Sequence, residues 1–230
     1  MSVRVGLLHP GEMGAAIGSG IAGEVLWASD GRSEATRARA AAFADAGTLA
    51  ALLPEVDVVV SVCPPHAALE VARACIGFGG VYVDANAISP LRAQEIAALH
   101  PRYVDGGIVG GPDAPTLYLS GDDAPAIAEL FTLETRVVAD ASAMKMAYAA
   151  WTKGTAAMLL AIRGVARHYG LEDEWRRAAP ELAEPLARAE RSAAAKGWRW
   201  VGEMEEIADT FAAAGQPEGF HRAAAEVYRG

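Results

Sequence analysis

The sequence is poor in cysteine and lacks long apolar runs. Its two cysteines, Cys63 and Cys75, provide neither a disulfide framework nor the paired spacing of a zinc site. No apolar run approaches the roughly 20 residues that span a membrane. The N-terminus leads straight into a strand-like pattern, without the apolar core and small-residue cleavage site of a signal peptide. We therefore expect a cytoplasmic protein with no membrane partner.

Positive charge is also in short supply. The chain has 20 Lys and Arg against 29 Asp and Glu, a formal net charge of −9, which argues against a nucleic-acid partner. Residues 1–140 carry 8 basic and 17 acidic side chains, whereas residues 141–230 carry 12 of each. This change in charge predicts two domains that meet near residue 140. His100, His168 and His221 lack partners at metal-ligand spacing, so we expect no metal.

Short β-rich runs alternate with helical patterns over residues 1–140. The run Val56–Cys63 is almost entirely apolar, as expected for a strand buried on both faces. Alternating strands and helices predict a parallel, doubly wound sheet. We therefore expect an α/β protein in which a Rossmann domain, residues 1–140, precedes a smaller all-helical domain, residues 141–230. The predicted strands are Val3–Leu8, Glu24–Ser29, Val56–Cys63, Val81–Ala85, Arg102–Gly107 and Thr116–Gly121.

Strand signals stop at Ser142. The segment Ser142–Tyr169 contains no proline and predicts one long helix. Its large apolar side chains point in most directions around the helix axis, and a helix that is apolar on most sides is buried on most sides. This helix therefore predicts a homodimer built from the helical domain. Shorter helices are expected over Glu172–Ala179, Glu181–Ala195, Val201–Ala214 and Pro217–Arg229, separated by Gly170, Gly197 and Gly215.

The segment after the first strand, His9-Pro10-Gly11-Glu12-Met13-Gly14, has the form of a phosphate-binding turn. Such a turn needs backbone amides at a helix N-terminus and glycines that let a pyrophosphate approach closely. Histidine takes the place of the first glycine of the usual G-x-G-x-x-G pattern. The alternative is a strand, turn and helix that pack together but bind no cofactor. The predicted cofactor contacts in this turn are His9, Pro10, Gly11, Glu12 and Met13.

The second strand leads into Asp30-Gly31-Arg32-Ser33, where a Rossmann domain meets the ribose of its cofactor. Arg32 can bind a 2′-phosphate and Ser33 can donate to it, which favours NADP. Asp30 argues the other way, for NAD. We expect NADP, held by Gly31, Arg32 and Ser33, with NAD as the alternative. In the alternative, neither residue contacts a cofactor: Ser33 only caps the following helix, and Arg32 is a charged side chain in solvent.

Several motifs together resemble the β-hydroxyacid dehydrogenase family, which includes 3-hydroxyisobutyrate and 6-phosphogluconate dehydrogenases, and are similar to the imine reductases. These motifs are Gly6-x-x-x-x-Gly11-x-Met13-Gly14, Gly31-Arg32-Ser33, Cys63-Pro64-Pro65, Val83–Pro90, Tyr103–Pro112 and Ala139–Lys145, in the family's order. The resemblance implies further cofactor contacts from Cys63, Pro64, Pro65 and Asn86. It implies substrate contacts from Gly106, Gly107 and Ile108.

By the same resemblance, Lys145 is the general acid/base that moves a proton as hydride moves. The chain has few lysines, and an arginine at this place could not give up a proton. The family's asparagine four residues later is Ala149 here. Tyr148 and Thr152 share the helix face of Lys145, so either is a candidate to bind the substrate oxygen. Lys153 either contacts a substrate anion or reaches solvent.

The motifs depart from the family pattern at His9, Val109, Ala139, Ala141 and Ala149, which points to a divergent subfamily. We expect an NAD(P)-dependent oxidoreductase that transfers hydride between NADP(H) and a small hydroxy or carbonyl compound. Reduction of a C=N bond, as in imine reductases, is one alternative. A catalytically idle, NADP-binding dimer module is the other.

Overall fold

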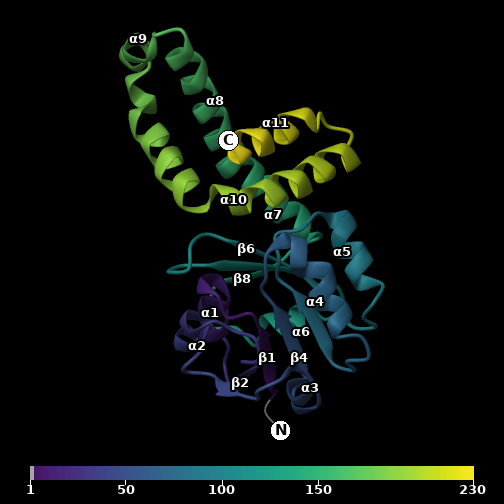
Figure 1. Cartoon of the computed structure of the whole chain (residues 1–230). Coiled ribbons are helices and arrows are strands. Elements are labelled where there is room, and N and C mark those ends of the chain that lie inside the picture. Colours follow the sequence, from purple (N-terminus) through teal and green to yellow (C-terminus); the bar gives the residue numbers. More distant parts are fainter. Residues whose placement is uncertain (1–2) are drawn as a thin grey trace. The chain divides into compact units, whose positions relative to one another are not determined.

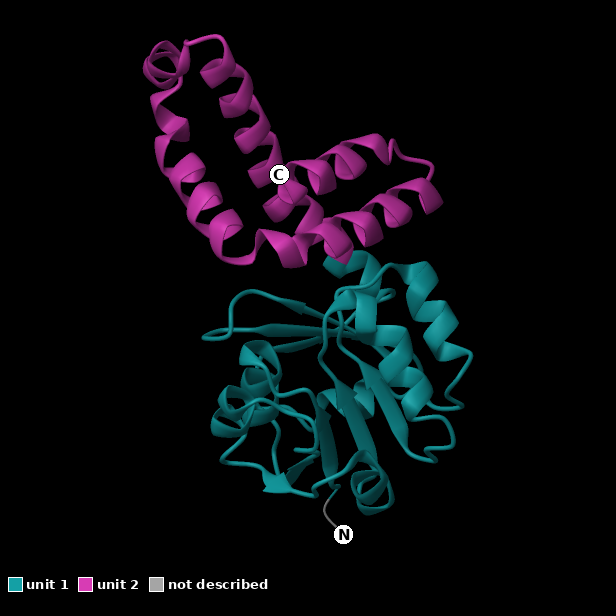
Figure 2. Cartoon of the chain, in the orientation of Figure 1, with its two compact units in different colours: residues 1–145 teal, residues 146–230 magenta. Residues whose placement is uncertain are grey.

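The computed structural model describes residues 3–230 (Figure 1). The first two residues of the predicted N-terminal domain lie outside the described part of the chain. The chain divides into two compact units, residues 1–145 and 146–230 (Figure 2). The boundary lies between Lys145 and Met146, inside helix α7 (Ala141–Ala149).

Unit 1 is built on one eight-stranded sheet with the strand order β3-β2-β1-β4-β5-β6-β7-β8. The order runs outward from β1 in one direction and from β4 in the other. The carboxyl ends of β1 and β4 therefore mark the switch point at which Rossmann domains bind ligands. The strands are β1 (Val5–Leu8), β2 (Val25–Trp27), β3 (Ala44–Asp45), β4 (Val58–Ser61), β5 (Val81–Asp84), β6 (Tyr103–Val109), β7 (Thr116–Ser120) and β8 (Thr135–Val137).

Helices cover both faces of this sheet, and each face has its own apolar core. The helices that lie within unit 1 are α1 (Glu12–Ser19), α2 (Glu34–Arg39), α3 (Leu49–Leu52), α4 (Ala68–Ala74), α5 (Pro90–Ala97) and α6 (Ala124–Ala128). Ile17 of α1 and Ile127 of α6 belong to one core, and Leu52 of α3 and Ile96 of α5 belong to the other. Along β4, Val59 faces the second core while its two neighbours face the first. The strand is thus buried on both faces, as its apolar run predicts.

The sheet is mostly parallel, as predicted, but one pair differs. β6 and β7 are antiparallel, with Ile108 opposite Leu117. The loop between them, residues 110–115, is too short for the crossover of about a dozen residues that parallel neighbours need. The short edge strands β3 and β8 were not predicted, because they are largely exposed and form no apolar run.

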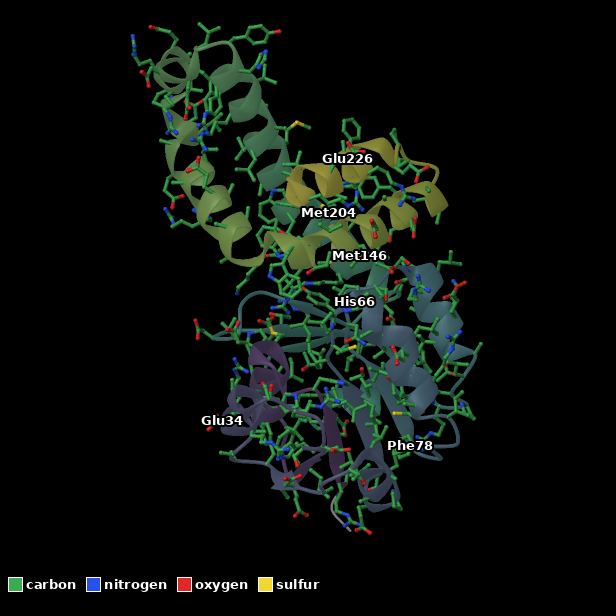
Figure 3. The ribbon with its side chains drawn as sticks, in the orientation of Figure 1. Glu34, His66, Phe78, Met146, Met204 and Glu226 are labelled. Atoms are coloured by element: carbon green, nitrogen blue, oxygen red, sulfur yellow. The ribbon has the colours of Figure 1, made fainter. Side chains whose placement is uncertain are left out.

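Helix α4 shows which end of unit 1 carries the switch point. The helix follows a short 3₁₀ turn, Pro65–Ala67, just after the carboxyl end of β4. Figure 3 shows His66 and Phe78 at the two ends of α4. His66 is exposed, whereas Phe78 is buried in the second core just before β5. The carboxyl edge of the sheet therefore lies on the His66 side.

Unit 2 is all-helical, as predicted. Across residues 3–230, the structure contains no helix that combines the length and apolarity needed to cross a membrane. Beyond α7, the elements of unit 2 are a π-helical turn (Ala150–Gly154), α8 (Thr155–His168), α9 (Glu172–Ala178), a 3₁₀ turn (Pro180–Leu182), α10 (Ala183–Ala213) and α11 (Gly219–Arg229).

The π-helical turn interrupts the long helix that the sequence predicts over Ser142–Tyr169. Such turns arise where an extra residue is accommodated within an α-helix, and they are frequent at functional sites. Here the phenol of Tyr228 donates to the carbonyl oxygen of Lys153 at 2.6 Å, and Thr152 Oγ1 donates to the carbonyl oxygen of Tyr148 at 3.1 Å. These side chains donate hydrogen bonds to backbone carbonyl groups at the place where the regular series of α-helical hydrogen bonds is interrupted.

The predicted break between two helices at Gly197 is wrong, because α10 continues through this residue. Gly197 is buried, and a Cβ on it would lie 3.6 Å from Cδ1 of Tyr228 in α11. The glycine therefore serves the close packing of α10 and α11. Gly170 and Gly215, by contrast, have φ angles of 69° and 68° and end helices as predicted.

Candidate active site

The carboxyl ends of the central strands form one row along the edge of the sheet. Leu8 of β1 pairs with Ser61 of β4, which pairs with Asp84 of β5, which in turn pairs with Asp105 of β6. The segments that follow these strands therefore emerge at the same edge. They include the turn after β1, the Cys63–Pro65 segment and the residues that follow β5. The fold thus brings most of the predicted cofactor contacts to one edge of unit 1.

The turn between β1 and α1 has the geometry expected of a phosphate-binding loop. Gly11 precedes the first turn of α1 and has no side chain to cap it, so an anion can accept from the amides there. A Cβ on Gly14 would lie 2.7 Å from the carbonyl oxygen of His9, so glycine is needed for α1 to approach the turn. His9 itself has a φ of 60°, in the left-handed region that favours glycine.

The turn after β2 is held by its own side chains. Gly31 has a φ of 67°, and Ser33 Oγ accepts a backbone N–H of α2 at 3.3 Å. Arg37 donates from its guanidinium to the carbonyl oxygen of Ser29 at 2.8 Å. Arg32 is half-buried, and its Nε is buried without a hydrogen-bond partner among the described residues. Ser33 is thus a helix cap, whereas Arg32 is not simply a solvated charge.

Asn86 connects the ends of β4 and β5. Its Oδ1 accepts from the backbone N–H of Cys63 at 2.5 Å, and its Nδ2 donates to Ser61 Oγ at 3.2 Å. Its backbone N–H donates to Asp84 Oδ1 at 3.0 Å. The two predicted cofactor contacts Cys63 and Asn86 are therefore linked directly. Burial, with a further contribution from Asp84, raises the pKa of Cys63 to about 12, so this side chain stays a thiol.

Asp105 anchors the start of α7 to the end of the sheet. Its carboxylate accepts from the backbone N–H of Ser142 at 2.7 Å, from Ser142 Oγ at 2.5 Å and from Ser120 Oγ at 3.1 Å. Burial raises the pKa of Asp105, and the hydrogen bonds from Ser142 and Ser120 oppose that rise. Because α7 is fixed at its first turn, Lys145, the last residue of unit 1, is placed relative to β6.

Lys145 lies against the strand that the sequence predicts to bind substrate. Its Nζ donates to the carbonyl oxygen of Ile108 at 2.7 Å. A Cβ on Gly107 would lie 2.8 Å from Cβ of Lys145 and 2.7 Å from the carbonyl oxygen of Ala141, so glycine lets α7 approach β6. At Gly106 a Cβ would lie 2.9 Å from the carbonyl oxygen of Asp84. The structure therefore brings Lys145 together with Gly107 and Ile108.

Three further predicted residues lie in unit 2. The ring of Tyr148 meets that of Trp151 edge-on at 5.8 Å, and Thr152 is engaged with helix carbonyl groups. Lys153 forms an ion pair with Glu203 in which both side chains are mostly buried, and its Nζ lies 5.6 Å from the centre of the Trp200 ring. Lys153 thus has an acidic partner, Glu203, within its own unit. The sequence predicted either a substrate anion or solvent beside Lys153, and not this ion pair.

The buried polar residues that support the site were not predicted from the sequence. These are Ser61, Asp84, Asp105, Ser120 and Ser142. One signal was available, since an aspartate inside an otherwise apolar strand needs hydrogen-bond partners when it is buried. The identity of those partners depends on strand register and could not be read from the sequence.

Two protein-family models match separate parts of the chain. The model described as saccharopine dehydrogenase NADP binding domain matches residues 20–110. The model described as domain of unknown function DUF1932 matches residues 166–230. The first match lies within unit 1 and the second within unit 2, and the first begins beyond the turn that contains His9.

One curated relative comes from Methanothermus fervidus and is described as an uncharacterized 28.5 kDa protein in the 7S RNA 5′ region. It is 35% identical over 133 residues, which cover 54% of this chain and 53% of that protein. The match thus spans about half the length of the relative.

Solved structures match nearly the whole chain. The conserved protein MTH1747, described as of unknown function and similar in structure to 3-hydroxyacid dehydrogenases, has a TM-score of 0.72 and 26% identity, covering 99% of this chain and 97% of that one. The 3-hydroxyisobutyrate dehydrogenase of Mycobacterium tuberculosis has a TM-score of 0.64 and 18% identity, covering 100% and 93%. A reductive aminase from Aspergillus terreus, solved with NADPH and ethyl levulinate, has a TM-score of 0.60 and 16% identity, covering 100% and 93%.

The fold and these matches define the class of protein: a Rossmann domain that matches an NADP-binding family model, followed by an all-helical domain. The resemblance to the β-hydroxyacid dehydrogenase family, expected from the motifs, is confirmed by the structural neighbours. The match to DUF1932 fits a divergent subfamily.

Proposed function

We propose that this protein is an NADP-dependent oxidoreductase that transfers hydride between NADP(H) and a small hydroxy or carbonyl compound, with Lys145 as general acid/base. The observation that carries the proposal is the position of Lys145, whose Nζ donates to the carbonyl oxygen of Ile108 at the switch-point edge of the sheet. The dehydrogenases and reductases among the structural neighbours support the same reaction class.

The residues of unit 1 fit a phosphate-bearing cofactor. The uncapped first turn of α1 offers amide groups to the pyrophosphate, and Gly14 keeps that helix close. The Nε of Arg32, which is buried and has no hydrogen-bond partner within residues 3–230, suits an additional phosphate, which favours NADP over NAD. Asn86 fixes the Cys63–Pro65 segment, which would lie beside the nicotinamide. When bound, the cofactor supplies or accepts the hydride.

Lys145 is suited to the proton transfer that accompanies hydride transfer. In the reductive direction its Nζ donates a proton to the substrate's carbonyl oxygen as hydride adds to the carbonyl carbon, which gives the hydroxyl group. In the oxidative direction the neutral amine removes the hydroxyl proton. Lysine can perform both steps, whereas arginine stays protonated. Ile108, which accepts a hydrogen bond from Nζ, holds the amine near the end of β6.

A C=N reduction is the second candidate, and the reductive aminase among the structural neighbours favours it. Tyr148 and Thr152 are then the alternative proton donors, although Thr152 already donates within its helix. A module that binds NADP without catalysis is the third. Loss of turnover on changing Lys145 separates the first candidate from the second, and cofactor binding without any turnover identifies the third.

A homodimer through unit 2 completes the proposal. Helix α8 and the π-helical turn before it expose a row of large apolar side chains at helical spacing, which a second copy of the chain would cover. These residues are Trp151, Met158, Ile162, Val165 and Tyr169. A cytoplasmic location suits the two free thiols and the acidic charge.

The direct test is cofactor binding followed by a search for turnover. Isothermal titration with NADPH and NADH should show tighter binding of NADPH. Small 3-hydroxy acids, aldehydes and cyclic imines are then screened by following NADPH oxidation or NADP reduction. Binding of neither dinucleotide at millimolar concentration would refute the proposal, and equal affinities would refute the preference for NADP.

A further inference from the structure

His9 occupies the place of a fingerprint glycine in a conformation that suits glycine better. Among the described residues it is the one non-glycine residue with a positive φ, 60°. The conformation is fixed by its surroundings, because the carbonyl oxygen of His9 accepts from Gly11 N at 2.7 Å and faces Gly14. A left-handed backbone is unfavourable for a residue with a Cβ, and such strain is commonly found where a side chain has a function.

The ring of His9 lies close enough to Arg32 to interact with its charge, and both side chains have polar atoms without hydrogen-bond partners among the described residues. Its Nδ1 is buried without a hydrogen-bond partner among the described residues, and the same holds for Nε of Arg32. The two residues follow β1 and β2, which are neighbouring strands. Buried polar atoms usually have partners, so two unpartnered nitrogens on adjacent turns point to a ligand that accepts hydrogen bonds.

We infer that His9 and Arg32 together bind one phosphate group of the cofactor, and that His9 takes up a proton when this phosphate binds. This inference rests on the proposed function. A protonated imidazole donates from both nitrogens, and its positive charge strengthens hydrogen bonds to phosphate oxygens. In a Rossmann turn the phosphate is either the pyrophosphate, common to NADPH and NADH, or the 2′-phosphate, which only NADPH carries.

The charge balance around His9 explains why the proton would come with the ligand. Burial and the positive charge of Arg32 lower the pKa of His9 to about 4, so the ring is neutral in the free protein. Of the titratable groups on the flanking elements, Cys63 after β4 stays a thiol, and Glu12 in α1 and Asp30 after β2 are exposed. A phosphate placed beside both cations offsets the charge of Arg32 and favours the imidazolium ion.

The test measures proton uptake during cofactor binding to the full chain. NADPH and NADH are titrated calorimetrically at about neutral pH in two buffers of different ionisation enthalpy, which gives the protons taken up per dinucleotide bound. The wild-type protein should take up about half a proton or more with NADPH. Its affinity for NADPH should rise as the pH falls through the neutral range.

The matched variant is His9→Asn, because asparagine tolerates the left-handed region and cannot be protonated. It should abolish the uptake and weaken NADPH binding by about tenfold or more. His9→Gly, which relieves the backbone, should have the same effect. The control His168→Asn removes an exposed histidine from unit 2 and should leave both quantities unchanged.

The outcomes separate this inference from the proposed function. Uptake with NADPH alone assigns the 2′-phosphate, and uptake with both dinucleotides assigns the pyrophosphate; either supports the role of His9. Binding without uptake, or uptake that persists in His9→Asn, overturns the role of His9 but leaves the proposed function intact. Absence of binding by either dinucleotide overturns both.

Discussion

Asp84 and Asp105 are register partners on neighbouring strands, and both carboxyl groups are buried. They differ in their partners. Asp105 accepts three hydrogen bonds from Ser142 and Ser120, whereas Asp84 accepts one from the backbone of Asn86, and its Oδ2 has no partner among the described residues. Burial, with a smaller contribution from Asp105, raises the pKa of Asp84 to about 7. In the folded protein, Asp84 therefore holds its proton up to about pH 7.

The raised pKa of Asp84 predicts a pH-dependent stability. Between the unfolded pKa of 3.8 and the folded pKa of about 7, the folded protein holds a proton that the unfolded chain has released. The stability from this group is complete below the unfolded pKa and is lost as the pH rises through about 7. The loss amounts to at most about 4 kcal/mol, since one pKa unit corresponds to about 1.4 kcal/mol.

Urea unfolding of wild type and Asp84→Asn over this pH range checks the prediction. The free energy of unfolding of the wild type should fall with pH more steeply than that of the variant, which has no proton to lose. Asp122→Asn, which removes an exposed carboxylate of unit 1, serves as the control and should keep the wild-type pH dependence. Parallel pH profiles for wild type and Asp84→Asn would show that Asp84 titrates normally.

Gly107→Ala should disturb the site with little effect on cofactor binding. The added methyl group would lie 2.8 Å from Cβ of Lys145 and 2.7 Å from the carbonyl oxygen of Ala141, so α7 must move away from β6. Overpacking of this kind typically costs about 1–3 kcal/mol of stability, and turnover should fall because Lys145 is displaced. Gly111→Ala is the matched control, since a Cβ there meets no atom within 4 Å. Equal effects of the two substitutions on turnover would contradict the packing argument.

Arg32→Ala should lower the affinity for NADPH by roughly 10- to 100-fold, because a charge-assisted hydrogen bond to phosphate is worth about 1.5–3 kcal/mol. The affinity for NADH should change much less if Arg32 binds the 2′-phosphate. Calorimetric titration of both dinucleotides measures the two effects. Arg39→Ala, on the exposed side of α2, is the control. A variant that loses Arg32 and keeps its preference for NADPH would rule out this contact.

Val165→Glu should convert the proposed homodimer into a monomer. Val165 is 61% exposed in the single chain and is one of the apolar residues of the exposed row on α8. A buried, unpaired carboxylate at a dimer interface is strongly unfavourable. Size-exclusion chromatography with light scattering should give half the wild-type mass. Ile76→Glu, at an apolar residue of unit 1 that is 60% exposed, should leave the mass unchanged. A wild-type protein that is monomeric at micromolar concentration would refute the proposed homodimer.

The apolar runs were sufficient to predict the main strands of unit 1 and the helical character of unit 2, because continuous burial leaves a strong pattern. The strand β7 was predicted, but its antiparallel direction was not, since that direction depends on the length of the connecting loop. The π-helical turn at Ala150–Gly154 leaves the apolar pattern nearly unchanged and depends on Tyr228, far along the chain. The predicted helix end at Gly197 is wrong, because the sequence does not distinguish a glycine that packs against another helix from one that ends its own helix.

The parts of the candidate site that lie in short sequence motifs could be predicted. The contacts that depend on strand register or helix packing could not. The turn at His9–Met13, Arg32 and the approach of Lys145 to Gly107 and Ile108 follow from short sequence motifs. The contact between Asp105 and Ser142 joins residues 37 apart in the sequence. The ion pair of Lys153 with Glu203 joins residues 50 apart, and only the packed helices bring them together.

The proposed reaction depends most on Lys145, and one comparison of turnover tests its role directly. With a substrate in hand, steady-state rates at saturating NADPH are measured for wild type, Lys145→Met, Lys145→Arg and the control Lys196→Met, which changes an exposed lysine of α10. We expect Lys145→Met to keep its affinity for NADPH and to lose about 10²–10⁴-fold in kcat, with Lys145→Arg similarly impaired because a guanidinium does not release its proton. Wild-type kcat in Lys145→Met, together with loss of turnover in Tyr148→Phe or Thr152→Val, would contradict the account and assign the proton transfer to unit 2.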